Sequence, residues 1–236
     1  MADTWVRTTG AVGFAGVAAA VATIPFAGSS PKSSSNATAI AAYVVAHQAQ
    51  LRTAGLLVVV SAALFLWFAG SYAWLLHRRD NRSPLWVIAL GASVAMTGLL
   101  LWDGLLSVAM SYLSRGRVDS SSALVAEYEL WNGVVMPGGF GFVMTVFLVA
   151  TAVSAFRGVI GGKGVGYLAA TLALLTVVSG VGGLTTVDGG TNSPVSFAPA
   201  ASMAIVVVTL SLIFVRGSRQ TEDNTTPRPL AASIDA

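Results

Sequence analysis

Cysteine is absent from the 236 residues, and charged residues make up only 10% of them. The first absence excludes disulfides, thiolate metal sites and cysteine nucleophiles. Histidine occurs only at His47 and His77, too few for a histidine-rich metal centre. The net charge of +3 is spread along the chain without a basic stripe carrying interleaved aromatics, so no nucleic-acid partner is expected. We therefore expect a protein without metal or other cofactor.

Hydrophobic residues, by contrast, make up 55% of the chain, and most lie in long uninterrupted runs. Six runs are about 20 residues long, the length that crosses a hydrocarbon core of about 30 Å. Only helices satisfy their backbone in lipid, and no run alternates as a barrel strand does. The predicted fold is an all-α, polytopic bundle of six transmembrane helices, with spans at about 8–27, 54–76, 85–109, 137–156, 165–184 and 199–215.

The first run could instead be a signal peptide, because Arg7 precedes an apolar stretch that ends in small residues. A cleavage site needs small residues at positions −1 and −3. Cutting after Ala27 puts Pro25 at −3, and cutting after Gly28 puts Phe26 there. Both are poor sites, so a retained helix is the favoured interpretation.

The distribution of lysine and arginine predicts the orientation. One set of connections holds nine of these residues, and the other holds Lys32, Arg52, Arg115 and Arg117. The richer set marks the inside, so both termini are predicted to be cytoplasmic. The turn HRRDNR, residues 77–82, is the clearest cytoplasmic connection. The expected location is the cytoplasmic membrane of a bacterium.

The outer connections are longer. The segment ATAIAAYVVAHQAQLRT, residues 37–53, is expected to be helical and could continue unbroken into the second span. Residues 111–136 favour a short amphipathic helix at the surface. At the other side of the membrane, the polar tail 217–236 is expected to be disordered.

Asp103 is the main candidate for chemistry, because an ionisable group near lipid is usually paired or functional. It lies about 27 Å along the third span from Leu85, near the outer interface, beside the aromatic Trp102. Two interpretations remain: an interfacial acid that meets headgroups or an arginine, and a proton- or cation-binding acid inside the bundle. The first is the favoured interpretation. A neighbouring face of small and polar residues nevertheless indicates that Asp103 turns toward protein and not lipid; it is formed by Ser93, Thr97, Gly104, Ser107 and Ser111.

A second candidate is the segment EYELWN before the fourth span. Glu127 and Glu129 could supply acids with Asp103, and Trp131 and Asn132 could contact a substrate. The favoured interpretation is a surface helix that is anchored by Tyr128 and Trp131 and has its acids in water. Tyr43 and His47 lie one helical turn apart on the same outer side, and a carboxylate that met this imidazole could transfer protons. The candidate substrate-binding residues are thus Trp102, Trp131, Asn132, Tyr43 and His47. The candidate catalytic residues are Asp103, Glu127 and Glu129.

Small residues recur at helical spacing in two spans, which lets helices approach closely. The stripes are Thr9, Gly13, Gly16, Ala20, Thr23 and Ala27 in the first span, and Gly166, Ala169, Ala170, Ala173, Thr176 and Gly180 in the fifth. These stripes indicate bundle assembly, or alternatively a homo-oligomer or another membrane-protein partner.

Pro137 at the start of the fourth span has two interpretations: it either begins the fourth helix or kinks that helix toward a cavity.

The stretch AIAAYVVAHQAQLRTAGLLVVVSAALFLWFAGSYAWLLHRR and the start of the fifth span, GVGYLAATLALL, resemble uncharacterised multi-pass membrane proteins of high-GC bacteria that carry a domain of unknown function. The resemblance implies no activity and assigns no functional residue.

Three functions fit the sequence. The first is a non-enzymatic accessory or lipid-contacting component of the membrane, whose partner is the bilayer. The second is a membrane-integral enzyme that uses acid–base catalysis on an apolar, lipid or isoprenoid-like substrate, much as a cyclase or isomerase would. The third is a small transporter. A cavity reaching Asp103 from the outer face would favour the second or the third.

Overall fold

A computed structural model describes residues 2–27, 37–113, 135, 138–185 and 198–225. Its elements are α1 (Ala2–Val21), α2 (Ile24–Ala27), α3 (Ala37–Ala46), α4 (Gln48–Arg79), α5 (Leu85–Leu113), α7 (Gly141–Phe156), α8 (Lys163–Thr185) and α9 (Ala198–Thr225). The described residues contain no strand. Six helical segments are long and apolar enough to cross a membrane, which confirms the predicted all-α fold and all six spans.

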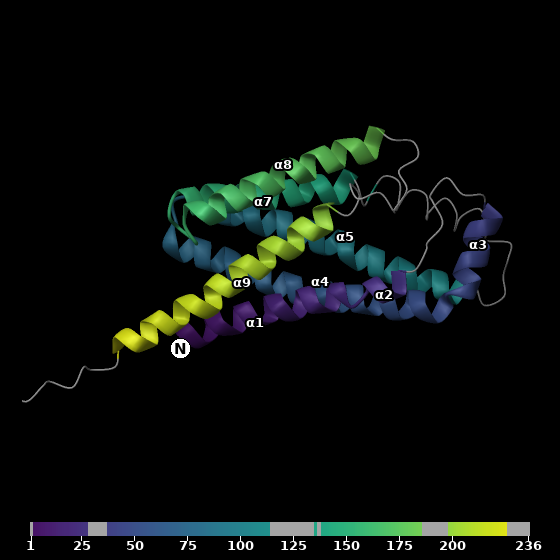
Figure 1. Cartoon of the computed structure of the whole chain (residues 1–236), viewed down its shortest axis with the longest axis horizontal. Helices are drawn as coiled ribbons and strands as arrows, with labels where there is room; N and C mark the ends of the chain where they lie inside the picture. The colour runs from purple at the N-terminus through teal and green to yellow at the C-terminus, as the bar shows by residue number, and fades with distance from the viewer. Residues whose placement is uncertain (1, 28–36, 114–134, 136–137, 186–197, 226–236) are drawn as a thin grey trace, which may run out of the picture.

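The helices pack as an elongated bundle (Figure 1). α4 packs against α5, α1 fills the side between α4 and α9, and the α7–α8 hairpin covers α5 and α9. The start of α1, the end of α9 and the turns α4–α5 and α7–α8 lie at one end of the bundle (Figure 1). We call this the basic end, because it holds the arginines of the HRRDNR turn.

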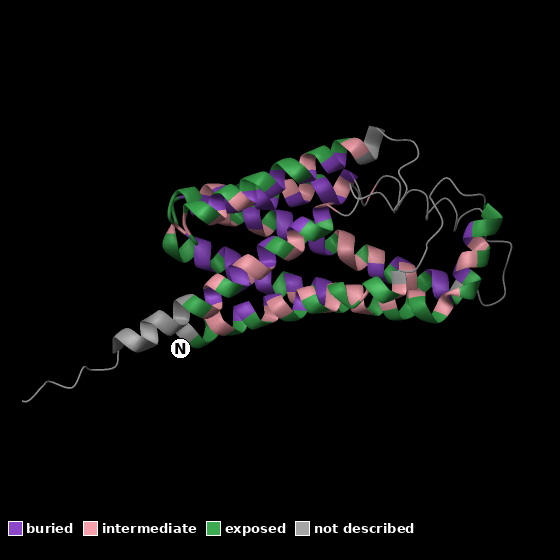
Figure 2. Cartoon of the chain, in the orientation of Figure 1, coloured by how far each residue is buried: buried purple, intermediate pink, exposed green. Residues whose placement is uncertain are grey.

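The outer sides of the bundle are apolar. Leu56, Val94, Leu174 and Val178 are each more than half exposed. Figure 2 shows exposed positions along the outer sides of the helices and buried ones where helices face one another. Water would not tolerate this much contiguous apolar surface, whereas lipid does. The chain is therefore a multi-pass integral membrane protein.

The interior is filled by aromatic side chains. Phe68, Tyr72 and Phe147 are fully buried between α4 and α7, and Phe214 joins them from α9. The Tyr72 hydroxyl donates a hydrogen bond of 3.1 Å to Thr151 Oγ1. This bond satisfies the phenol at a depth where no water is available.

Two arginines form polar contacts between the turns at the basic end. Arg79 Nη1 donates to the Val159 carbonyl oxygen at 2.9 Å, which ties the end of α4 to the α7–α8 turn. Arg157 Nη1 donates to Ser83 Oγ at 3.2 Å and lies 3.8 Å from an Asp80 carboxylate oxygen. The two hairpins are thus joined by polar contacts where the chain leaves the bundle.

Three local details differ from the expectations. The first span is interrupted at Ala22 and Thr23, because Pro25 has no N–H to bond to the Val21 carbonyl. The helix before the second span is not continuous with it: α3 ends at Ala46 and turns away from the axis of α4 (Figure 1). α9 continues to Thr225, so the first part of the tail expected to be disordered is helical; residues 226–236 lie outside the described part.

Candidate functional site

The predicted outer site is only partly described. Asp103 and Trp102 lie on α5, Tyr43 on α3 and His47 at the junction of α3 and α4. Glu127, Glu129, Trp131 and Asn132, together with Pro137, lie outside the described residues. Whether the acids meet Asp103 therefore stays a prediction.

Asp103 is half-buried and has an interaction partner, whereas Trp102 beside it is 58% exposed. The acid lies next to Gly104, where α5 lies close against α4: a Cβ on Gly104 would come within 2.7 Å of the Gly55 carbonyl oxygen. Ser93, Thr97 and Ser111 are buried, so the small polar face predicted for this helix does turn toward protein. Asp103 flanks a helix crossing rather than lying free in lipid.

Tyr43 and His47 do share one side of the chain. Their rings stack with centroids 4.5 Å apart, and His47 Nδ1 donates to the Tyr43 carbonyl oxygen at 2.9 Å. Burial raises the pKa of the Tyr43 phenol, so this group stays neutral near neutral pH. The carbonyl bond holds the imidazole at the helix junction, and a role of His47 in proton transfer stays a prediction.

Three hollow spaces can be described by the residues that line them. A polar one of about 130 Å³ is lined by Gln48, Ala49 and Arg52 near the start of α4 and by Ser111 near the end of α5. An apolar one of about 90 Å³ lies among α1, α4, α5 and α9, with Ser61, Phe65 and Leu100 in its wall. Asp103 lines neither of them, nor the larger groove described next.

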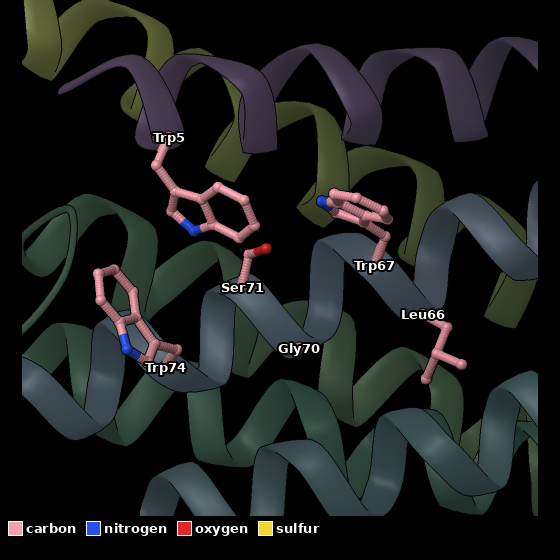
Figure 3. A pocket seen from close by; sticks show the side chains of 6 residues that line it. All are labelled: Trp5, Leu66, Trp67, Gly70, Ser71 and Trp74. Atoms are coloured by element: carbon pink, nitrogen blue, oxygen red, sulfur yellow. The ribbon is translucent and has the colours of Figure 1, made fainter. Parts of the chain in front are cut away.

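The largest of these spaces is a groove of about 560 Å³ between α1 and α4, lined by Trp5, Leu66, Trp67, Gly70, Ser71 and Trp74. We call it the tryptophan groove. Figure 3 shows Trp5 projecting from α1 toward α4, with Trp67 and Trp74 on either side of Ser71. The Trp5 and Trp67 rings lie 6.1 Å apart with a 33° tilt. Each of the three indoles is 41–54% exposed.

Small residues keep the groove open. A Cβ on Gly70 would have no neighbour within 4 Å, so a larger side chain would project into free space. Ser71, the next residue, is buried at the floor. Both walls belong to helical segments that are long and apolar enough to cross a membrane, Thr4–Phe26 and Gln48–Arg79.

Sequence reasoning missed this groove. Trp67, Gly70 and Trp74 recur at steps of three and four residues, a spacing that places them on one face of a helix. That signal could have identified the α4 wall. Trp5 is separated from it by two further elements, and only the packing of α1 against α4 brings it there.

No family model, curated protein or solved structure matches the chain. The resemblance to uncharacterised bacterial membrane proteins therefore stays a prediction.

Proposed function

We propose that the protein is a non-enzymatic, lipid-contacting component of a bacterial cytoplasmic membrane, and that the tryptophan groove holds one lipid molecule. The observation that carries the proposal is an open groove of about 560 Å³ with three half-exposed indole side chains, on two helices long and apolar enough to cross a membrane. Indole rings bring a large apolar surface together with one N–H donor, which suits the region between acyl chains and headgroups.

The shape of the groove supports an acyl chain as its occupant. The missing side chain of Gly70 leaves a channel along α4, and Trp5 closes it from the side of α1. The groove is an open one, so an acyl chain could enter it from the side without any helix moving. Contact with aromatic faces then adds dispersion energy to a chain that lies there.

The packing around the other candidate gives less support to catalysis or transport. Tyr72, Phe68 and Phe147 fill the centre of the bundle, and Asp103 lines none of the three hollow spaces. An enzyme acting on an apolar substrate would need a chamber next to its acid. The enzyme and transporter alternatives would regain support if segment 114–134 formed such a chamber with Asp103.

Retention of lipid by the purified protein tests the proposal. The full chain is delipidated in mild detergent, supplied with a phospholipid and weighed by native mass spectrometry. Gly70→Leu should fill the groove and lower the retained lipid severalfold. Gly91→Leu is the matched control, because Gly91 is also a helical glycine with no neighbour within 4 Å of its Cβ position, but lies on α5. Equal retention by both variants and the unmodified protein would overturn the proposal.

A further inference from the structure

A cation lies at one end of the tryptophan groove. The guanidinium carbon of Arg78 stands 4.9 Å from the centre of the Trp74 ring. Arg78 lies one helical turn beyond Trp74, at the basic end of the bundle. The stacked ring fixes the direction of a long side chain that would otherwise be free to rotate.

Within the described residues, Arg78 contacts the Trp74 ring, whereas the neighbouring arginines bind polar groups of the fold. Arg79 is bonded to the Val159 carbonyl, and Arg157 to Ser83 and Asp80. Within the part of the chain that the structure describes, no carboxylate pairs with Arg78. Its hydrogen-bond donors are thus available to an anion from outside the protein, and guanidinium groups bind phosphate in bidentate geometry.

The length of the site matches one half of a bilayer. From Trp67 to Arg78 the helix rises about 16 Å, at about 1.5 Å per residue. One leaflet contributes about half of a hydrocarbon core of about 30 Å. A phosphate held at Arg78 would therefore lie at headgroup depth, while its acyl chain lay along Gly70 and Trp67.

We propose that the tryptophan groove selects an anionic phospholipid, whose phosphate group binds Arg78 and whose acyl chain lies between Trp5 and Gly70. This inference rests on the proposed function, since it names the headgroup of the lipid that the groove would hold. A neutral zwitterionic lipid also carries a phosphate, but its cationic group offsets the attraction of Arg78 and of the basic turn.

Comparison of the binding of two lipids tests which headgroup the groove prefers. The full chain in detergent is titrated with phosphatidylglycerol or phosphatidylcholine of identical acyl chains, and bound lipid is counted by native mass spectrometry. The unmodified protein should prefer phosphatidylglycerol, and Arg78→Gln should reduce that preference about fivefold, the effect of one surface cation on an anionic lipid. Arg78→Lys should restore part of it, because the charge returns without the planar group.

Arg82→Gln is the matched control, because it removes one positive charge from the exposed turn at the same end. It should leave the preference nearly unchanged, and an equal loss in both variants would overturn the inference in favour of diffuse attraction. Equal binding of the two lipids that is still abolished by Gly70→Leu would overturn the headgroup inference alone. If Gly70→Leu changed the oligomeric mass and not the bound lipid, a second copy would occupy the groove and both proposals would fail. Melting curves verify that each variant is folded.

Discussion

Gly55 of α4 and Gly104 of α5 lie backbone against backbone: a Cβ placed on Gly55 would come within 2.5 Å of the Gly104 carbonyl oxygen, and the reverse distance is 2.7 Å. A contact this close requires glycine on both helices, since the atoms in the way are backbone and cannot rotate aside. It sets the crossing of the two longest spans at their outer ends and fixes the position of Asp103, the residue before Gly104.

Gly104→Ala should therefore destabilise the protein by about 1–3 kcal/mol, the usual effect of overpacking a close contact. Thermal unfolding in detergent would measure the change. Gly98→Ala on the same helix is the control: its Cβ would meet nothing within 4 Å, and alanine favours a helix over glycine. A melting temperature that fell equally in both variants would contradict the tight crossing.

Tyr72→Phe should lower the free energy of unfolding by about 1 kcal/mol, because it removes the hydrogen bond to Thr151 and leaves the ring packing intact. Thr151 keeps its bond to the Phe147 carbonyl oxygen at 2.9 Å, so no buried donor is left unsatisfied. Tyr167→Phe provides the comparison, since that phenol is 65% exposed. If Tyr72→Phe unfolded no more easily than Tyr167→Phe, the buried hydrogen bond would contribute nothing to the free energy of unfolding.

Asp103→Asn distinguishes a structural acid from a catalytic one. Under the proposed function the variant should melt at a lower temperature in detergent and retain as much lipid as the unmodified protein, because Asp103 lies outside the tryptophan groove. If Asp103→Asn left the melting temperature unchanged but failed to rescue a cellular phenotype caused by deletion of the gene, the enzyme or transporter would be supported instead.

Cysteine labelling can test the predicted orientation in the membrane, since the native chain has no cysteine. A cysteine at Thr38, exposed on α3, should react with a membrane-impermeant reagent added to intact cells. A cysteine at Asn81, exposed in the α4–α5 turn, should react only after the cells are opened. The opposite pattern would reverse the predicted topology and place Arg78 in the outer leaflet.

Hydropathy and small-residue spacing predicted much of this fold, because each is a local property that a single helix carries. The stripe in the first span is an example: Gly13 packs against Phe68 of α4 and Ser211 of α9. The tryptophan groove could not be predicted in this way, since Trp5 and Trp67 come together only through the pairing of α1 with α4. The break at His47 was missed for a similar reason: α3 leaves the axis of α4 to pack Ile40 and Val44 against Leu106 and Met110 of α5.

The most direct measurement of lipid in the tryptophan groove is fluorescence quenching at low lipid. One background keeps only the groove indoles, with Trp86, Trp102 and Trp131 changed to Phe; the other keeps those three and changes Trp5, Trp67 and Trp74 to Phe. Each is titrated in detergent micelles with a phospholipid brominated in its acyl chain. We predict that the first equivalent of lipid quenches the groove background and not the other, and that Gly70→Leu abolishes this quenching. Equal quenching of both backgrounds, unaffected by Gly70→Leu, would contradict the account.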